Sequence, residues 1–91
     1  MGETTTRIAL IGILISKSDS VSELNALLSK YGSYIVGRMG IPYREKNVSI
    51  ISIAIDAPND VISALSGKIG MLPGISSKTI YAKNLFLLVE A

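Results

Sequence analysis

The sequence contains no cysteine and no histidine, and these two absences exclude several kinds of chemistry. Without cysteine, the chain cannot form a disulfide, hold zinc or an iron–sulfur cluster through thiolates, or use a thiol nucleophile. Without histidine, it has no imidazole base and no Ser-His-Asp triad. The lack of cysteine agrees with a reducing cytoplasm, where we expect the protein.

Charged residues are also scarce, at 18% of the chain, and nine basic against seven acidic residues leave a net charge of +2. Proteins that bind nucleic acids usually concentrate Lys and Arg on one face. Here these residues are spread along the chain, so direct binding to DNA is not expected. The longest apolar run, Ile8–Ile15, is too short to span a bilayer, so no membrane partner is expected either.

Hydrophobic residues are abundant: they make up 48% of the 91 positions, and the mean hydropathy is +0.46. We expect residues 1–91 to form a single domain, and a domain of this size buries only about two-thirds of its unfolded surface. This excess of apolar side chains predicts that subunit contacts cover some of them.

The hydrophobic pattern predicts six elements in the order βαββαβ. Ser20 and Glu23 match a capping box at the start of the first helix, and Asn59 or Asp60 begins the second. The expected strands span residues 7–15, 34–41, 48–56 and 75–82, and the expected helices span 21–31 and about 59–69.

The two halves of this pattern have equal spacing, because 27 residues separate Arg7 from Tyr34 and Val48 from Ile75. Two equal split βαβ units predict an α+β, ferredoxin-like βαββαβ sandwich with strand order 4-1-3-2 and both helices on one face. The core would span residues 6–82, and residues 83–91 would form an apolar tail, either a further edge strand or a segment that docks on a partner.

The first and third strands are apolar on both faces, which predicts that another subunit covers the face without helices. We therefore expect a homodimer or homotetramer that assembles through sheet faces or edges.

The segment GRMGIPYRE, residues 37–45, is expected to be an edge strand followed by a hairpin. Gly37 and Gly40 could form a bulge or allow a close backbone approach. Simple alternation directs Met39 toward the helices and Arg38 toward the open face, beside the predicted subunit contact. A role in subunit contact and a role in ligand binding both remain open for this segment.

The predicted topology brings three loops to one end of the sheet: residues 16–19, 42–47 and 70–74. A helix N-terminus and the cations Arg44 and Lys46 would suit an anion there. Asp56 and Asp60 are interpreted as a strand end and a helix cap, so no metal site, cofactor or catalytic residue is expected. The candidate ligand or interface residues are Arg38, Gly40, Tyr43, Arg44, Ser18 and Asp19.

Two segments, YIVGRMGIPYREKNVSIISIAIDAP and DVISALSGKIGMLPGISSKTIYAK, resemble the iron-only hydrogenase system regulators. The resemblance covers about residues 7–83. It implies an ACT-like fold similar to the C-terminal domain of the nickel-responsive repressor, and a regulatory domain that oligomerises through its sheets. The nickel-responsive repressor binds metal through His and Cys, which this chain lacks, so metal-dependent repression is not carried over.

The resemblance implies a regulatory or sensor module that binds a small effector at a subunit interface. The alternative is a ligand-free oligomerisation or adaptor domain that acts through protein–protein contacts. Some ferredoxin-like proteins hydrolyse acyl phosphates with Arg and Asn, but the sequence shows no activated nucleophile or acid–base pair. We therefore do not expect an enzyme.

Overall fold

The four predicted strands and two predicted helices all form in the computed structural model, which describes residues 5–16 and 18–83. The predicted C-terminal tail lies outside these residues, except for Lys83. Short 3-10 turns connect the main elements. The elements are β1 (Thr6–Ile15), η1 (Ser18–Ser20), α1 (Val21–Lys30), η2 (Gly32–Tyr34), β2 (Ile35–Tyr43), η3 (Arg44–Lys46), β3 (Val48–Pro58), α2 (Asn59–Gly70) and β4 (Ile75–Tyr81).

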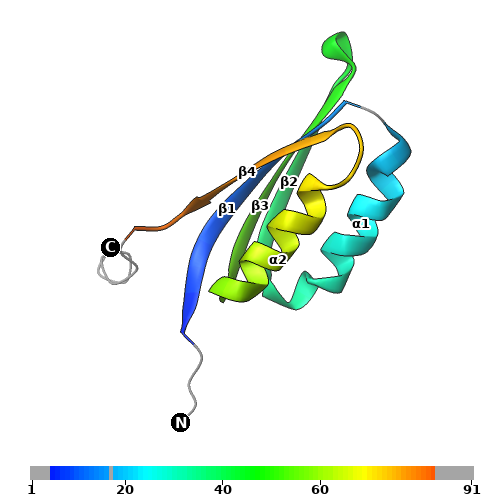
Figure 1. The fold of residues 1–91 in the computed structure, drawn as a ribbon. Helices are drawn as coiled ribbons and strands as arrows, with labels where there is room; N and C mark the ends of the chain where they lie inside the picture. The colour runs from blue at the N-terminus through cyan, green and yellow to red at the C-terminus, as the bar shows by residue number, and fades with distance from the viewer. Residues whose placement is uncertain (1–4, 17, 84–91) are drawn as a thin grey trace.

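The strands form one antiparallel sheet in the order β2-β3-β1-β4. This is the predicted order 4-1-3-2 read from the opposite edge, so the predicted topology is confirmed. Both helices lie on the same face of the sheet (Figure 1). The central strands β1 and β3 therefore present one face to the helices, while no helix within residues 5–16 and 18–83 covers the other face.

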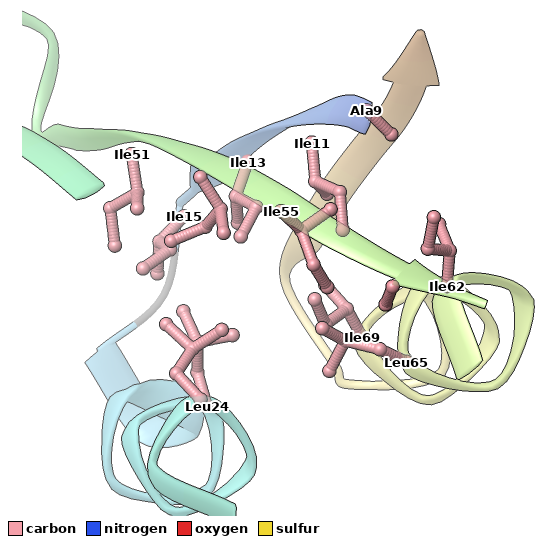
Figure 2. Packing of buried hydrophobic residues seen from close by; sticks show 13 residues of the cluster. Ala9, Ile11, Ile13, Ile15, Leu24, Ile51, Ile55, Ile62, Leu65 and Ile69 are labelled. Carbon is pink, nitrogen blue, oxygen red and sulfur yellow. The ribbon is translucent and has the colours of Figure 1, made fainter. Parts of the chain in front are cut away.

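The hydrophobic core lies between the sheet and the helices. Ile11 of β1 and Ile53 of β3 are fully buried, as are Leu24 of α1 and Leu65 of α2. Figure 2 shows this group, with the isoleucine side chains between the strands and the helices. Each such side chain contributes roughly 1.5–3 kcal/mol by leaving water, so this layer supplies most of the stability.

The start of α1 differs from the predicted capping box. The Ser20 side chain is buried and donates a hydrogen bond to the backbone oxygen of Pro73, at 2.7 Å, and it makes no capping bond within its own helix. The hydroxyl therefore ties α1 to the α2–β4 turn. That turn ends at Gly74, whose φ of 75° is a left-handed conformation that favours glycine.

Strand β2 also differs from the prediction, because its register shifts between Ile35 and Gly37. Residues opposite each other in adjacent strands share a face. Ile35 pairs with the buried Ile55, but beyond the shift Arg38 pairs with the buried Ile53 and Met39 with Ser52. A bulge at Val36, next to the predicted Gly37, thus reverses the alternation. The expectation that Met39 faces the helices and Arg38 the open face is wrong.

We call the sheet surface opposite the helices the open face. Among the residues that the structure describes, ten large hydrophobic residues are exposed, and seven of them lie on this face, as their pairing with the even-numbered residues of β1 and β3 shows. Antiparallel sheets with a solvated face usually carry polar side chains there. The seven residues are Leu10 and Leu14 of β1, Met39, Ile41 and Tyr43 of β2, Ile50 of β3, and Ile80 of β4.

Candidate functional site

The three loops predicted to meet at one end of the sheet do meet. The backbone and side chain of Ser16, at the end of β1, both donate to the backbone oxygen of Gly74, each at 2.9 Å. The Ser20 bond to Pro73 adds a second link between the same two loops. The β2–β3 hairpin lies at this end too and projects beyond the rest of the sheet (Figure 1).

A hollow of about 200 Å³ lies between the hairpin and the β1–α1 junction. We call it the loop-end hollow. Its walls combine aliphatic side chains with hydroxyl and amide groups and one guanidinium. The nine lining residues are Ile15, Ser16, Val21, Pro42, Tyr43, Arg44, Asn47, Val48 and Ser49.

Among the described residues that line the loop-end hollow, Arg44 is the charged one. None of its nine described lining residues is acidic, and Asn47 and Ser49 carry groups that can donate hydrogen bonds, whereas the Ser16 hydroxyl already donates to Gly74. A guanidinium with neighbouring hydroxyl and amide donors is suited to a carboxylate or phosphate group. The volume restricts the ligand to a small molecule.

Two of the six candidate residues belong to the loop-end hollow. Tyr43 and Arg44 line it, and the Tyr43 hydroxyl donates to Oε1 of Glu45 at 3.0 Å. Ser18 and Asp19 belong to the short turn η1 next to the hollow, and Asp19 is exposed and is not among the described lining residues. Lys46, the second cation expected there, is exposed in η3 and does not line it.

The other two candidates, Arg38 and Gly40, lie farther along β2 and do not contact the loop-end hollow. Arg38 is exposed at the sheet edge and shares a face with the helices. A Cβ atom added to Gly40 would approach the Ile51 side chain at 3.9 Å, an ordinary contact. Gly40 therefore does not mark a close backbone approach, whereas the bulge expected at Gly37 or Gly40 is confirmed beside Gly37.

Sequence reasoning placed Ser16 and Asn47 in loops at this end of the sheet, but it named neither of them, nor Ser49, as a candidate ligand residue. One signal pointed to Asn47: it follows the short turn η3 and adopts a left-handed conformation with φ 56°, which asparagine tolerates better than most residues. Ser16 and Ser49 carry no such signal, because only the β1–β3 pairing, which places Ile15 opposite Ser49, brings the two segments together.

The described residues contain no cluster that suggests metal binding. Within residues 5–16 and 18–83, no group of three or more Asp, Glu, His or Cys side chains lies close enough to hold a metal ion. Among the helices in this part of the chain, none has the length and apolar character needed to cross a membrane.

Comparison with known proteins identifies a family. A family model described as "TM1266-like: Iron-only hydrogenase system regulator, putative" matches residues 7–79. The solved structure of the uncharacterized protein TM1266 from Thermotoga maritima is similar, with 34% sequence identity and a TM-score of 0.82. The match covers 86% of this chain and 99% of that one.

A second solved structure shares the fold alone. It is a formyltetrahydrofolate deformylase from Pseudomonas putida KT2440, with a TM-score of 0.58 and 10% sequence identity. The similar region covers 80% of this chain but only 28% of the deformylase chain. Among curated proteins, none matches this chain.

Proposed function

Because this chain belongs to the TM1266-like family of iron-only hydrogenase system regulators, we propose that it is a regulatory module that binds a small anionic effector in the loop-end hollow. The observation that supports this proposal is the position of Arg44 beside hydroxyl and amide donors, with no acidic residue among the described residues that line the hollow. The module would be an ACT-like sensor domain in the cytoplasm, without catalytic activity of its own.

The loop-end hollow is well placed for a switch because its walls come from two separate parts of the chain. Tyr43 and Arg44 belong to the hairpin region, while Ser16 and Val21 flank the β1–α1 connection. An anion held by both sides would draw the hairpin toward the start of α1. Such an effector would favour the state that it binds more tightly, and the difference between its two affinities would set the size of the shift.

Native mass spectrometry of the protein purified gently from its own cytoplasm tests this proposal. We expect a reproducible extra mass that corresponds to a small anion, and we expect it to be lost in Arg44→Ala. Lys46→Ala is the matched control, because Lys46 is an exposed cation on the same hairpin that does not line the hollow. An extra mass that persists in Arg44→Ala would contradict the assigned site.

Thermal unfolding with inorganic phosphate and with acetate provides a second test. An anion at a hundredfold its dissociation constant stabilises the folded state by about 2.7 kcal/mol. For a domain of this size, this energy raises Tm by roughly 10–20 °C. Arg44→Ala should weaken the binding of such an anion by about tenfold to a hundredfold, since it removes a charged donor. Lys46→Ala should keep the wild-type response.

The second candidate function is a ligand-free oligomerisation or adaptor domain, a homodimer or homotetramer that acts through protein–protein contacts. The apolar open face favours it. A clean oligomer with no retained mass and no anion-dependent Tm would support this candidate over the sensor. Neither candidate includes DNA binding, and a steeply salt-dependent shift of duplex DNA would contradict both.

A further inference from the structure

The open face has more exposed apolar surface than a monomer usually shows. Its seven large hydrophobic residues are between 37% and 67% exposed. If each has about 200 Å² of surface when fully exposed, these fractions correspond to roughly 700 Å². The largest apolar patch on a typical monomer is about 300–600 Å², whereas each partner in a stable interface contributes about 800 Å².

We infer that a second copy of this chain covers the open face, so that two sheets pack face to face. The estimated area is close to what one partner contributes to a standard dimer interface. A two-fold interface uses the same patch on both subunits, so the patch must be complementary to itself. An apolar patch meets this requirement, because two copies of it exclude water from each other without repulsion.

The charges on the open face agree with a second copy as the occupant. Among the described strand residues of this face, the charged ones are Lys78 of β4, opposite Gly12, and Asp56 of β3, opposite Ile8. They have opposite signs, so the face has no net charge. A partner that carries mostly one sign of charge would bind a face of the opposite sign. A face with one charge of each sign instead packs against a second copy of itself without net repulsion.

The open face has a hollow that side chains of the second copy would occupy. Gly12 lies in the middle of β1, and a Cβ atom added there would meet nothing closer than the Lys78 backbone oxygen at 4.0 Å. A hollow of about 400 Å³ opens around it, bordered by Leu14, Ile50 and Lys78. When two sheets pack face to face, the side chains of one sheet insert between those of the other.

The bulge in β2 enlarges this surface. Because the register shifts beside Val36, the exposed Met39, Ile41 and Tyr43 all lie on the open face together with Leu14 and Ile50. Unbroken alternation from Ile35 would have placed them on the helix side. The interface therefore extends over all four strands, which this sequence would not achieve without the register shift.

Sedimentation velocity over a range of concentrations tests this inference with Met39→Glu and Ile80→Glu, on opposite edge strands of the open face. Each should raise the dissociation constant of the dimer at least a hundredfold, because the carboxylate would be buried against an apolar surface. Met71→Glu is the matched control: Met71 is 83% exposed in the α2–β4 turn and should not affect association. Circular dichroism checks that all variants remain folded.

Three results would overturn the inference. One is a wild-type chain that stays monomeric at every concentration. Another is an oligomer unaffected by both substitutions, which would place the contact at sheet edges. The third is a monomer that forms complexes with a different protein through Met39. Because Met39 and Ile80 do not line the loop-end hollow, the response to phosphate and acetate is tested separately, and either proposal can fail without the other.

Discussion

The two faces of the sheet carry the same kinds of side chain but have different surroundings. Ile11 and Ile53, which face the helices, have no exposed surface, whereas Ile50 and Ile80 on the open face are 37% and 67% exposed. All four are isoleucines in one sheet. Hydrophobicity alone therefore does not show which face the chain covers by itself and which it leaves to a partner.

The difference assigns separate roles to the two faces. The helix-covered face is complete within one chain, so its apolar side chains stabilise the fold. The apolar side chains of the open face gain less from folding, since about 37% to 67% of the surface of each stays in contact with water. Their burial would stabilise an assembly, and its free energy would then depend on protein concentration.

The largest expected effect comes from truncating an isoleucine on the helix-covered face. Ile53→Ala would leave a cavity in the packed core and should lower the free energy of unfolding by about 2–5 kcal/mol. Ile80→Ala, on the open face, is the matched variant and should change the stability of the isolated chain by less than about 0.5 kcal/mol. Urea unfolding at several protein concentrations separates folding from association. Equal losses in the two variants would mean that the faces do not differ in this way.

A smaller loss of stability is expected from removing the buried hydroxyl that links α1 to the α2–β4 turn. Ser20→Ala removes the buried hydroxyl that donates to the backbone oxygen of Pro73. Leaving that oxygen without its donor should lower the free energy of unfolding by about 1–3 kcal/mol. Ser22→Ala, at an exposed position of α1, serves as the control and should have little effect. A wild-type stability for Ser20→Ala would show that the link between the two loops contributes nothing.

The smallest effect is expected from deleting Val36. Because Ile35 pairs with Ile55 and Gly37 with Ala54, removing the intervening residue would leave every other pair in place. Met39 and Ile41 would stay on the open face, now by regular alternation. We expect a change in stability below about 1 kcal/mol and a dissociation constant close to that of the wild type, measured by sedimentation. Loss of association would show that the bulge itself forms part of the contact.

Much of the fold could be predicted because its signals are local. The apolar runs in residues 7–15 and 48–56, and the helical spacing of Leu24, Leu28, Ile62 and Leu65, indicate elements that the structure confirms. Of the candidate site, Tyr43 and Arg44 were predicted and line the loop-end hollow. Ser16 and Ser49 were missed, since only strand pairing brings them together.

The sequence by itself determined the order of the elements and the excess of apolar side chains, because hydrophobic period and turn residues act over a few neighbouring positions. The equal spacing of the two βαβ units then predicted the sheet topology. The tertiary structure decided the rest. It shifted the register of β2 and so placed Met39 rather than Arg38 on the open face. It also directed the Ser20 hydroxyl to the backbone oxygen of Pro73 instead of to the N-terminus of its own helix. These outcomes depend on contacts between distant segments, whose geometry no local pattern specifies.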